Sequence, residues 1–460
     1  MKRILLKLFL KPWRGSVLLY AVVFGVLGFS IVVIAVSGYA IFENRASIYK
    51  HNREQAFQIA EAGINYYRWH LAHDKFDFQD GTATSGPYIH EYTDKDRNVI
   101  GHFSLNITPP STTNTIVVVE STGWLDSQPN SARKIRVRLG FPSLTDYSFL
   151  TANDVWIGNT EFTHGKFHAN GGIRYDGIAD AAVTSAQETY ICKEHQGCGW
   201  TLKPGIWGSG GPTEYWDFPV PAKDFTIITV KLEEIEALAD ENGLLLSASG
   251  SQGWRLKFNA DGTISVNEVL TTKCYKGADI GEIGYSFYCI DPKTYGPTTT
   301  YPAPANGYIF VNDNIWVEGV VNGRVTIGTS VDHDIILNND ITYLAKDGNH
   351  VLGLISERDI LVPHDSPDDL EIDAALLAQH GACKRYYYPS DKKDSIYIYG
   401  SVITYGVWTW SWTSGGSVVV SGYVHTNSTY DANLTYSPPG GFPVGSSYNL
   451  VDWEEVEEVR

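Results

Sequence analysis

The side chains of this chain that could do chemistry are its cysteines, its histidines, a few closely spaced aspartates and a run of alternating tryptophans. Cys192 and Cys198 enclose His195 in the segment CKEHQGC. Thiols and imidazoles bind zinc, but a structural zinc site normally has about four protein ligands. No second cysteine or histidine pair with matching spacing lies nearby. We therefore expect no metal at this segment.

Disulfide bonds are the favoured interpretation of the cysteines, provided that this part of the chain lies outside the cytoplasm. Cys192 and Cys198 are close enough in sequence to close a small loop, and Cys274 with Cys289 could clamp a hairpin. Cys383 would then remain free. Reduced thiols are the main alternative, and metal binding is the lesser one.

His164 and His168 are a second pair that suggests a metal site. They lie in a strand-turn-strand context, where a four-residue step does not place both on one helical face. Asn170 and Gly171 supply the backbone conformations of a turn. We expect the two histidines to make hydrogen bonds in these turns.

Paired carboxylates are the enzymatic alternative, because glycoside hydrolysis uses two carboxyl groups about 5 to 9.5 Å apart. Asp332 and Asp334 would share one strand face, and Asp340 and Asp359 follow. No histidine, arginine or further acid has a convincing pattern beside them, and acids are common in turns. We expect no catalytic residue and no cofactor.

Tryptophans alternate in the segment VWTWSW, so a strand would direct Trp408, Trp410 and Trp412 to one face. An exposed row would be a stacking platform for sugar rings, whereas a buried row would be the core of the last sheet. Tryptophan is usually largely buried. The core interpretation is favoured, and a glycan platform is the alternative.

The N-terminal elements are the most informative part of the chain. A leader, 1–15, carries Lys2, Arg3, Lys7, Lys11 and Arg14 and no acid. The segment 16–42 then has 27 residues without a charge, more than the roughly 20 needed to cross a bilayer. By the positive-inside rule we expect a single membrane helix, with the N-terminus in the cytoplasm and the bulk of the chain outside.

The helix is expected to continue beyond the membrane, because 43–73 contains no proline and no cluster of turn formers. Apolar residues recur there mostly at three- and four-residue steps, the pattern of an amphipathic helix. They are Ala46, Tyr49, Ala56, Phe57, Ala60, Ile64, Tyr67 and Leu71. One helix from 16 to about 72 would be about 85 Å long.

Arg14, Gly15, the apolar run and the segment NREQAFQIAEAGINYYRWHL at 52–71 together resemble the N-terminus of type IV pilin-like proteins. The closest likeness is to minor pilins and pseudopilins of the large, atypical kind. The resemblance implies that a prepilin peptidase cuts between Gly15 and Ser16 on the cytoplasmic side and methylates Ser16. An ordinary signal anchor is the alternative.

One position departs from that family. Most pilins have a glutamate at mature position five, which pairs with the N-terminal amine of a neighbouring subunit, and this chain has Tyr20 there. An unpaired ammonium is costly in lipid. A subunit without the acid is tolerated most easily where no neighbour depends on it, as at a fibre tip. Alternatively, Tyr20 is one more membrane-facing aromatic.

The rest of the chain has many short β-branched runs separated by glycine, asparagine and aspartate, typical of an all-β region. We expect strands at 103–107, 116–122 and 134–139 behind the helix, a pilin-like region at 74–142, and a β-rich head at 143–460. Helical patterns recur only at 231–242 and 369–380. Three apolar pairs follow at ten-residue steps and predict an irregular parallel β-solenoid: Ile315 and Val317, Val325 and Ile327, Ile335 and Leu337.

Two other segments resemble the same family. The block from Asp146, with His-x-Asn-Gly-x-Ile, is similar to the opening of its β-solenoid-like domain. The last part is similar to its closing region at Tyr430, Asp431, Leu434, Pro438, Pro439 and Trp453. No specific activity is attached to that pattern.

Net charge argues against a nucleic-acid partner. The formal charge is -17, and loss of the five basic leader residues would take it to about -22.

The resemblance to pilin-like proteins implies a mainly β structural subunit, not an enzyme, whose partners are a prepilin peptidase, other pilins, the assembly platform and the membrane. It would be carried from the cytoplasmic membrane into a pilus or secretion filament at the cell surface. The alternatives are an adhesin for glycan or protein and, less favoured, a membrane-anchored carbohydrate-active enzyme.

Overall fold

The computed structural model describes residues 14–111, 113–226, 232–414, 418–445 and 447–456, and side chains from Val17 onward. The chain divides into two compact units. The first unit comprises Met1–Thr108, Val118–Arg138 and Val451–Arg460, and the second comprises Pro109–Val117 and Leu139–Leu450. The predicted class, mainly β with one long N-terminal helix, is confirmed.

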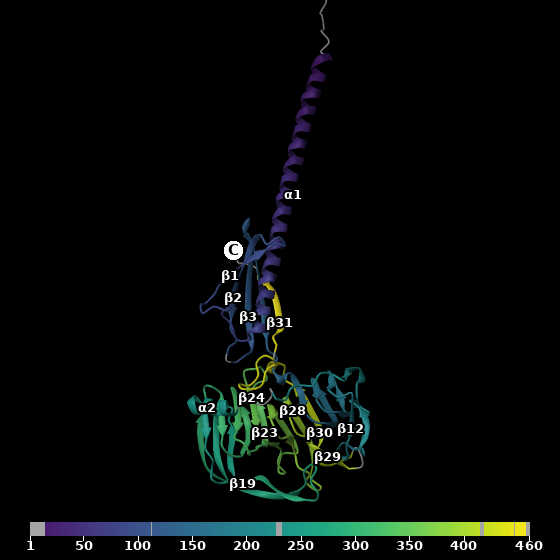
Figure 1. Ribbon diagram of the computed structural model, residues 1–460, viewed down its shortest axis with the longest axis vertical. Coiled ribbons are helices and arrows are strands. Elements are labelled where there is room, and N and C mark those ends of the chain that lie inside the picture. Colours follow the sequence, from purple (N-terminus) through teal and green to yellow (C-terminus); the bar gives the residue numbers. More distant parts are fainter. Residues whose placement is uncertain (1–13, 112, 227–231, 415–417, 446, 457–460) are drawn as a thin grey trace, which may run out of the picture. The chain divides into compact units, whose positions relative to one another are not determined.

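Helix α1 spans Arg14–His73 without interruption (Figure 1). Every residue from Val17 to Lys50 is exposed, including all the apolar side chains of 17–42. Burial begins in the second half, where Ala56, Ile59, Ala60, Ile64, Tyr67 and Leu71 are covered. The predicted apolar stripe is therefore buried from Ala56 onward, except that Phe57 is half-buried, whereas Ala46 and Tyr49 remain exposed.

A five-stranded sheet packs against that second half. Its order is β1-β2-β3-β4-β31, and the strands are β1 (Tyr88–Thr93), β2 (Val99–Thr108), β3 (Ile116–Leu125), β4 (Gln128–Gly140) and β31 (Asn449–Val456). β2 pairs antiparallel with β1 and with β3. Burial alternates along β3, so Val117 and Val119 face the core and their neighbours do not. The strands predicted at 103–107, 116–122 and 134–139 are confirmed.

Glycines allow the helix and sheet of the first unit to approach closely. A Cβ added at Gly123 on β3 would collide with the backbone of Ala56 and Ala60 on α1. A Cβ at Gly63 on α1 would meet the side chains of Ser121 and Phe103 in return. Because the Gly123 contacts are to helix backbone, no side-chain rotation can relieve them.

The last strand returns to the first unit. β31 lies beside β4, and Arg133, Arg136 and Arg138 of β4 form ion pairs with Glu455, Glu454 and Asp452 of β31. The sequence analysis assigned all of 143–460 to the head, but the structure places 451–456 with the helix and its sheet. The acidic end of the chain is held there by the complementary charge of β4.

Strands are the main regular elements of the second unit, and most of them belong to a 21-stranded sheet. The strands of that sheet are β5 (Tyr147–Thr151), β7 (Glu161–His164), β8 (Lys166–Ala169), β10 (Ile178–Ala179), β11 (Val183–Ser185), β15 (Trp216–Asp217), β16 (Leu244–Leu246), β17 (Gly253–Phe258), β18 (Thr263–Gly277), β19 (Ser286–Pro302), β20 (Tyr308–Val311), β21 (Ile315–Val321), β22 (Arg324–Thr329), β23 (Ile335–Tyr343), β24 (Val351–Ser356), β25 (Ile360–Leu361), β26 (Asp369–Ala378), β27 (Cys383–Lys384), β28 (Lys392–Thr404), β29 (Ser411–Ser414) and β30 (Val418–Tyr430). Smaller sheets contain β6 (Val155–Ile157), β9 (Ile173–Tyr175) and β14 (Ile206–Trp207), and β12 (Thr189–Cys192) with β13 (Thr201–Pro204).

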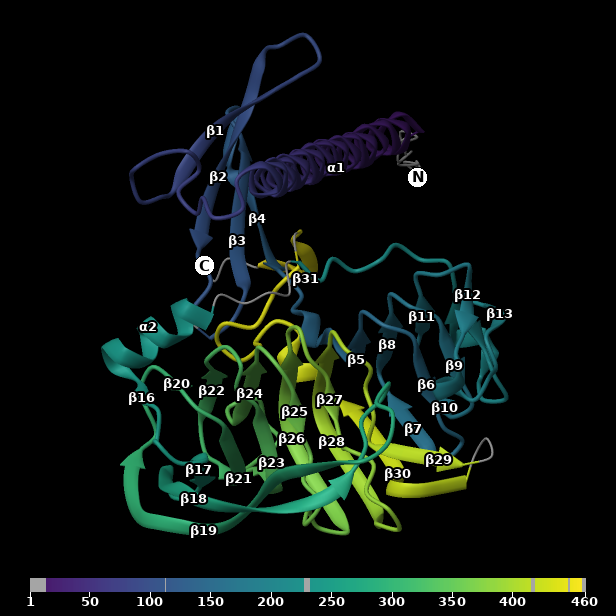
Figure 2. The same cartoon turned by 60° about the horizontal axis from the view of Figure 1, so that its bottom comes forward.

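Parallel pairing dominates the second unit and forms what we call the parallel stack, the run of parallel strands that includes β20, β22, β24, β26 and β28 (Figure 2). The predicted apolar pairs are buried inside it. The ten-residue step, however, does not give the pairing. Ile315 on β21 pairs with Ile335 on β23, twenty positions along, while Val325 on β22 pairs with Leu352 on β24. The parallel stack thus has two walls, one containing β21 and β23 and the other containing β20, β22 and β24, and successive predicted pairs belong to alternate walls.

The order of strands in the parallel stack differs from their order in the chain. β5, the first strand of the unit, pairs with β28, with Phe149 opposite Val402. β8 and then β11 continue the stack beyond β5. Buried apolar residues from both parts of the sequence consequently form one continuous core cluster.

One of the two predicted helices is confirmed. α2 spans Leu232–Asn242 and buries Leu232, Ile235 and Ala239, as its periodicity predicts. The helix predicted at 369–380 is wrong, because Asp369–Ala378 is strand β26. Its residues from Ile372 onward are buried on both faces, because alternate side chains pack in two different core clusters: Ile372, Ala374, Leu376 and Ala378 in one, and Ala375 and Leu377 in the other. A continuous apolar run of this kind shows no strand alternation in the sequence.

A test of the helix-sheet packing follows from Gly123. We expect Gly123→Ala to lower the free energy of unfolding by about 1 to 3 kcal/mol, because the new methyl group forces α1 away from β3. The measurement is the thermal unfolding midpoint of the purified full chain. Gly199→Ala is the matched control, since a Cβ there meets nothing within 4 Å. Equal midpoints for the two variants would contradict the close approach.

Candidate functional site: the exposed helix and a tryptophan-lined groove

The first candidate site is the apolar half of α1. One helix in the described part of the chain, Val17–His73, is long and apolar enough to cross a membrane by length and composition. Its best 18-residue window has a mean hydropathy of 2.8. An all-round apolar helix in water exposes a large area whose burial is favourable at about 25 cal/mol per Å². This half of α1 therefore needs an apolar environment supplied by lipid or by other helices.

The predicted processing and assembly residues lie at the start of α1. Gly15 and Ser16 are in its first turn, and the leader residues 1–13 lie outside the described residues. Tyr20 is 60% exposed, one turn further on, among apolar neighbours. The structure thus places Tyr20 on an open helical surface.

The second candidate site contains the tryptophan segment, but in a different form from the predicted row. Trp408 and Trp410 are only 7% and 1% exposed and belong to the core cluster, as the core interpretation expected. Trp412 lies in strand β29, outside that core cluster, and its Nε1 donates to the carbonyl oxygen of Arg385 at 2.9 Å. Residues 407–410 are not a strand, so the alternation that would align the three rings does not apply. An exposed flat platform of the three is therefore wrong.

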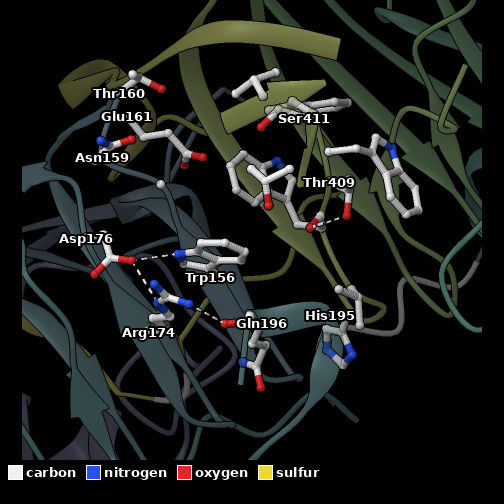
Figure 3. Close-up of a pocket in the computed structure, with 18 of the residues that line it drawn as sticks. Trp156, Asn159, Thr160, Glu161, Arg174, Asp176, His195, Gln196, Thr409 and Ser411 are labelled. Atoms are coloured by element: carbon white, nitrogen blue, oxygen red, sulfur yellow. Dashed lines mark hydrogen bonds and ion pairs between the residues drawn. The ribbon is translucent and has the colours of Figure 1, made fainter. Parts of the chain in front are cut away.

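The same three tryptophans line a cavity of about 540 Å³ together with residues from the first strands of the unit (Figure 3). Trp156 on β6, Glu161 at the start of β7 and Arg174 on β9 contribute the opposite wall. The juxtaposition follows from the pairing of β5 with β28, and Phe149 of β5 packs edge-on against Trp408 with ring centroids 5.1 Å apart.

Arg174 organises one wall of this cavity. Its guanidinium lies over the Trp156 ring, 4.2 Å from the centroid, and its Nε donates to Asp176 at 2.8 Å. The indole Nε1 of Trp156 donates to the same carboxylate at 2.9 Å. Burial raises the pKa of Asp176, but hydrogen bonds from Ser209 and Trp156 and the charge of Arg174 outweigh burial and lower that pKa overall. The charges of Arg174 and Asp176 in this wall are therefore paired with each other.

The pKa of Glu161 is shifted in the opposite direction from that of Asp176. It is 9% exposed, and burial raises its pKa to about 8, against the opposing effect of a hydrogen bond from the Gly158 backbone. Near neutral pH its carboxyl group therefore keeps a proton and can donate a hydrogen bond. Figure 3 shows Glu161 and Trp156 beside the same open space.

A second cavity of about 790 Å³ adjoins the first and shares Glu194, His195, Ile280 and Trp412 with it. Its further lining includes three aromatic residues, Trp200, Tyr285 and Tyr387. We call the two cavities together the tryptophan groove. Trp200 is 65% exposed and Tyr285 is 53% exposed, so the outer part of the groove is open to solvent.

Two disulfide bonds hold the loops that edge the groove. Cys192 is bonded to Cys198, which closes the loop carrying His195, and Cys274 is bonded to Cys289 across the β18–β19 hairpin whose tip carries Tyr285. Cys383 is buried and free.

The loop closed by Cys192 and Cys198 also sets the environment of His195. Burial, followed by the charge of Lys193, lowers the pKa of His195.

The other predicted chemical residues do not enter the groove. His164 bonds Asp180 at 2.6 Å, and buried His168 bonds Thr184 and Asn170. Both histidines make hydrogen bonds as expected, but His168 does so from within β8, with Thr184 on the neighbouring strand β11. Among the described residues no group of three or more histidine, cysteine, aspartate or glutamate side chains could hold a metal ion.

Two of the four aspartates considered for catalysis are neighbours, because the backbone N–H of Asp359 donates to the Asp334 carboxylate at 3.2 Å. Asp334 also forms an ion pair with Arg358 at 2.7 Å, and burial raises its pKa to about 6. Asp359 accepts from the backbone of Ala382 and Asp340 from that of Glu371, while Asp332 has φ +72° in a turn. Asp334, Asp340 and Asp359 thus each accept a backbone hydrogen bond.

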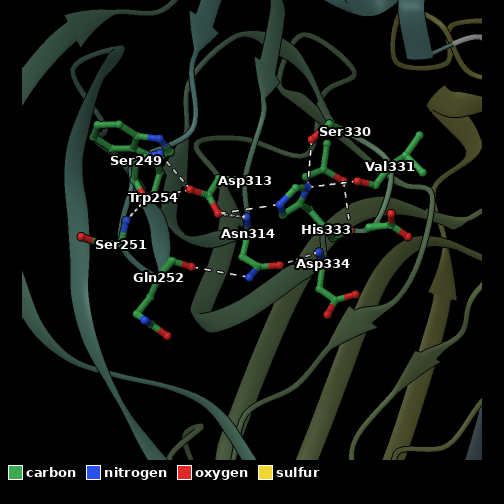
Figure 4. A network of polar contacts seen from close by, with 12 residues as sticks. Ser249, Ser251, Gln252, Trp254, Asp313, Asn314, Ser330, Val331, His333 and Asp334 are labelled. Carbon is green, nitrogen blue, oxygen red and sulfur yellow. Dashed lines mark hydrogen bonds and ion pairs between the residues drawn. The ribbon is translucent and has the colours of Figure 1, made fainter.

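A nearby network has the residue types of a hydrolase triad without its geometry (Figure 4). Ser330 Oγ lies 2.9 Å from His333 Nδ1, but His333 Nε2 is 4.0 Å from Asp313, beyond hydrogen-bond length. Asp313 instead accepts from Ser249 Oγ at 2.7 Å and from its backbone. The network connects the turns of neighbouring strands.

Sequence reasoning missed Trp156, Glu161, Arg174 and Asp176. They come from short strands between glycine turns, and no spacing in that segment distinguishes them from other loop residues. Only the pairing of distant strands brings them to the tryptophan segment.

The fold and these sites define a class: a β-rich protein with a long, half-exposed N-terminal helix and a separate groove. No protein-family model matches the chain, and no curated protein matches it in sequence. Among solved structures, it is similar to the competence-associated pilin ComZ from Thermus thermophilus, with 14% identity over 88% of this chain and 97% of that chain. The TM-score of 0.26 is too low for the likeness to establish a shared fold.

Stability should depend on pH through Glu161. The folded state keeps the proton to about pH 8, while the unfolded chain releases it near the ordinary value of 4.5. Between those values the folded state binds more protons, so the free energy of unfolding falls as pH rises. We expect the unfolding midpoint of Glu161→Gln to rise relative to the parent between about pH 5 and about pH 8.

Ser411→Ala, which replaces a residue that does not titrate in the lining of the same cavity, is the control. Its difference from the parent should stay constant across the series. A constant difference for Glu161→Gln as well would contradict the buried, protonated carboxyl group.

Proposed function

We propose that this protein is a pilin-type subunit, anchored in a membrane by α1 and assembled with other pilins in a filament. The observation that carries the proposal is the division of α1 into two halves. Its first half exposes apolar side chains all round, and its second half packs on the antiparallel sheet of the first unit. This arrangement suits a helix that leaves lipid and enters a bundle of similar helices.

Burial of the apolar side chains on the exposed half of α1 is favourable in two environments, a bilayer and a bundle of helices. A bilayer can cover the uncharged run, since about 20 residues cross the hydrocarbon core. A helical bundle can cover the same surface in a filament, because apolar side chains pack as well against each other as against lipid. Transfer from one to the other requires work, which an assembly platform and motor would supply.

In its finer form, the proposal is a minor pilin or pseudopilin of a type IV pilus or a secretion filament. A prepilin peptidase would cut between Gly15 and Ser16 and methylate Ser16. The position of these residues at the start of α1 supports that site, because the cut would leave the apolar helix at the mature N-terminus.

The proposed location is the cytoplasmic membrane, with the N-terminus inside, and then the filament at the cell surface. The basic leader supports this orientation. The Cys192–Cys198 and Cys274–Cys289 disulfides support an oxidising environment for the second unit. We propose a structural role without catalysis and without nucleic acid as a partner.

Processing can be tested by the intact mass and N-terminal residue of the protein from membranes of cells with and without prepilin peptidase. We expect a chain that begins at methylated Ser16 only when the peptidase is present. Gly15→Leu should leave the Met1 chain, because the bulky side chain blocks the cut. Gly25→Leu, where an added Cβ meets nothing, should be processed normally. An unprocessed parent chain in both strains would overturn the pilin-type proposal.

Tyr20 gives a separate test of assembly. We expect Tyr20→Glu to raise the ratio of this subunit to the major subunit in sheared filaments, because the new carboxylate can pair with the N-terminal amine of a neighbour. Tyr20→Phe, which changes no charge, should leave the ratio at the parent value. The readout is quantitative mass spectrometry of filament fractions. An unchanged ratio for Tyr20→Glu would show that position five does not limit packing.

A further inference from the structure

The tryptophan groove has the size of a ligand site. Its two adjoining cavities, about 540 and 790 Å³, lie within or near the range of about 300 to 1,000 Å³ that is typical of small-molecule pockets. The residues shared between them, Trp412 and His195 among others, make the surface continuous. A ligand of several linked rings would use this length, whereas a single small ring would occupy only one end.

The groove offers aromatic rings in both of its parts. Trp156 and Trp412 line the inner cavity, and Trp200, Tyr285 and Tyr387 line the outer one. Aromatic rings bury apolar faces while keeping polar edges available. A ligand with flat apolar faces and polar edges would fit this lining.

Two tryptophans at the inner cavity carry indole donors that the protein does not use. The Nε1 atoms of Trp408 and Trp410 are buried and have no hydrogen-bond partner among the described residues. Leaving a buried donor unpaired is unfavourable by about 1 to 3 kcal/mol. Both residues line the cavity, but these nitrogen atoms are covered, so a ligand would contact ring atoms of the two tryptophans and not these donors.

Additional polar side chains surround the same space. Asn159, Thr160, Ser209 and Ser411 line the inner cavity beside Glu161. Figure 3 shows Asn159, Thr160 and Glu161 on one side of it and Ser411 on the other. Amide, hydroxyl and carboxyl groups can both donate to and accept from ligand hydroxyls.

The charge of the lining selects against anions. Apart from Glu161, which keeps its proton near neutral pH, its acidic residues are Asp154, Asp176, Glu194, Asp279 and Glu282, and its basic residues are Arg174 and Lys193. Arg174 is paired with Asp176, Lys193 lies 3.4 Å from Asp154, and Lys384 pairs with Asp279. A polyanion would meet a lining with more carboxylates than cations and with its cations already paired, so nucleic acids and acidic sugars are disfavoured.

The groove is also held in shape before any ligand arrives. The Cys192–Cys198 loop and the hairpin clamped by Cys274–Cys289 contribute lining residues to both sides of the outer cavity. Loops restrained in this way lose little conformational freedom on binding, which favours affinity.

We propose that the tryptophan groove binds an oligosaccharide of several neutral or amino-sugar rings. Sugar rings combine apolar faces, which stack on tryptophan and tyrosine, with hydroxyl edges that would bond the polar side chains of the lining, Asn159, Thr160, Ser209 and Ser411. This inference goes beyond the role in filament assembly and depends on different residues.

Binding should be measured with the full chain in lipid nanodiscs, since many detergents carry sugar headgroups. The panel contains neutral, amino-sugar, uronic-acid and sulfated oligosaccharides, single monosaccharides and single-stranded DNA, and tryptophan fluorescence is the readout. We expect saturable binding of neutral or amino-sugar oligosaccharides, binding at least about tenfold weaker for monosaccharides, and none for the anionic members.

Two exposed groove residues have matched controls outside it. Trp200→Ala and Tyr285→Ala should each weaken binding by about tenfold or more, because each removes a stacking surface. Trp69→Ala on α1 and Tyr397→Ala on β28, with 61% and 52% exposure of the parent side chains, should bind as the parent does. Unchanged unfolding midpoints would show that all four variants are folded.

Three results would overturn the proposal: no oligosaccharide of the panel binds, an anionic member binds preferentially, or groove and control variants lose affinity equally. Because the assay needs no filament, its failure leaves the proposed role in assembly untouched. Failure of processing by the peptidase would likewise leave the groove to be judged by these measurements alone.

Discussion

Pairing between parallel strands that are distant in sequence is the constraint on which the second unit depends. Phe149 on β5 lies opposite Val402 on β28, so the first strand of the unit extends a stack built largely from later ones. Each strand buries its neighbour's apolar residues, and none has a complete core alone. The same pairing places Trp156, Glu161 and Arg174 opposite the tryptophan segment, so the groove exists only when this register forms.

The first unit depends on a simpler arrangement, in which one helix serves two environments. Its second half lies so close to the sheet that Gly63 and Gly123 leave no room for a methyl group. Its first half carries no comparable packing and remains fully exposed. Ion pairs between β4 and β31 complete the sheet at its edge. The docked half orients the helix relative to its own sheet, while the exposed half is available to lipid or to other helices.

Much of the fold could be predicted because its signals are local. The charge-free run at 16–42, the spacing from Ala56 to Leu71, and the periodicity of 231–242 each identify a helix without knowledge of any partner. Local signals fail where a segment is buried on both faces. Leu370, Ala374, Leu377 and Ala378 fit a helical stripe, yet they lie in β26 between two parallel neighbours.

The candidate site could be predicted only in part, for a related reason. The tryptophan run is conspicuous in the sequence, but strand alternation predicted a flat face, whereas Trp408 and Trp410 are buried and Trp412 lies beyond them in β29. The residues opposite come from β6, β7 and β9, and only long-range pairing brings them there. The ten-residue spacing of the apolar pairs likewise did not predict the strand pairing, because it does not show which wall of the stack a strand joins.

The central claim is that this chain is a filament subunit, and its presence in filaments is the most direct test. Filaments would be sheared from intact cells, separated from membranes by sedimentation, and analysed by mass spectrometry for peptides of both units. The account predicts such peptides in the filament fraction of assembling cells and their loss from it when the assembly motor is inactive. Recovery of the protein only with membranes, while other subunits appear in the sheared filaments, would contradict the account.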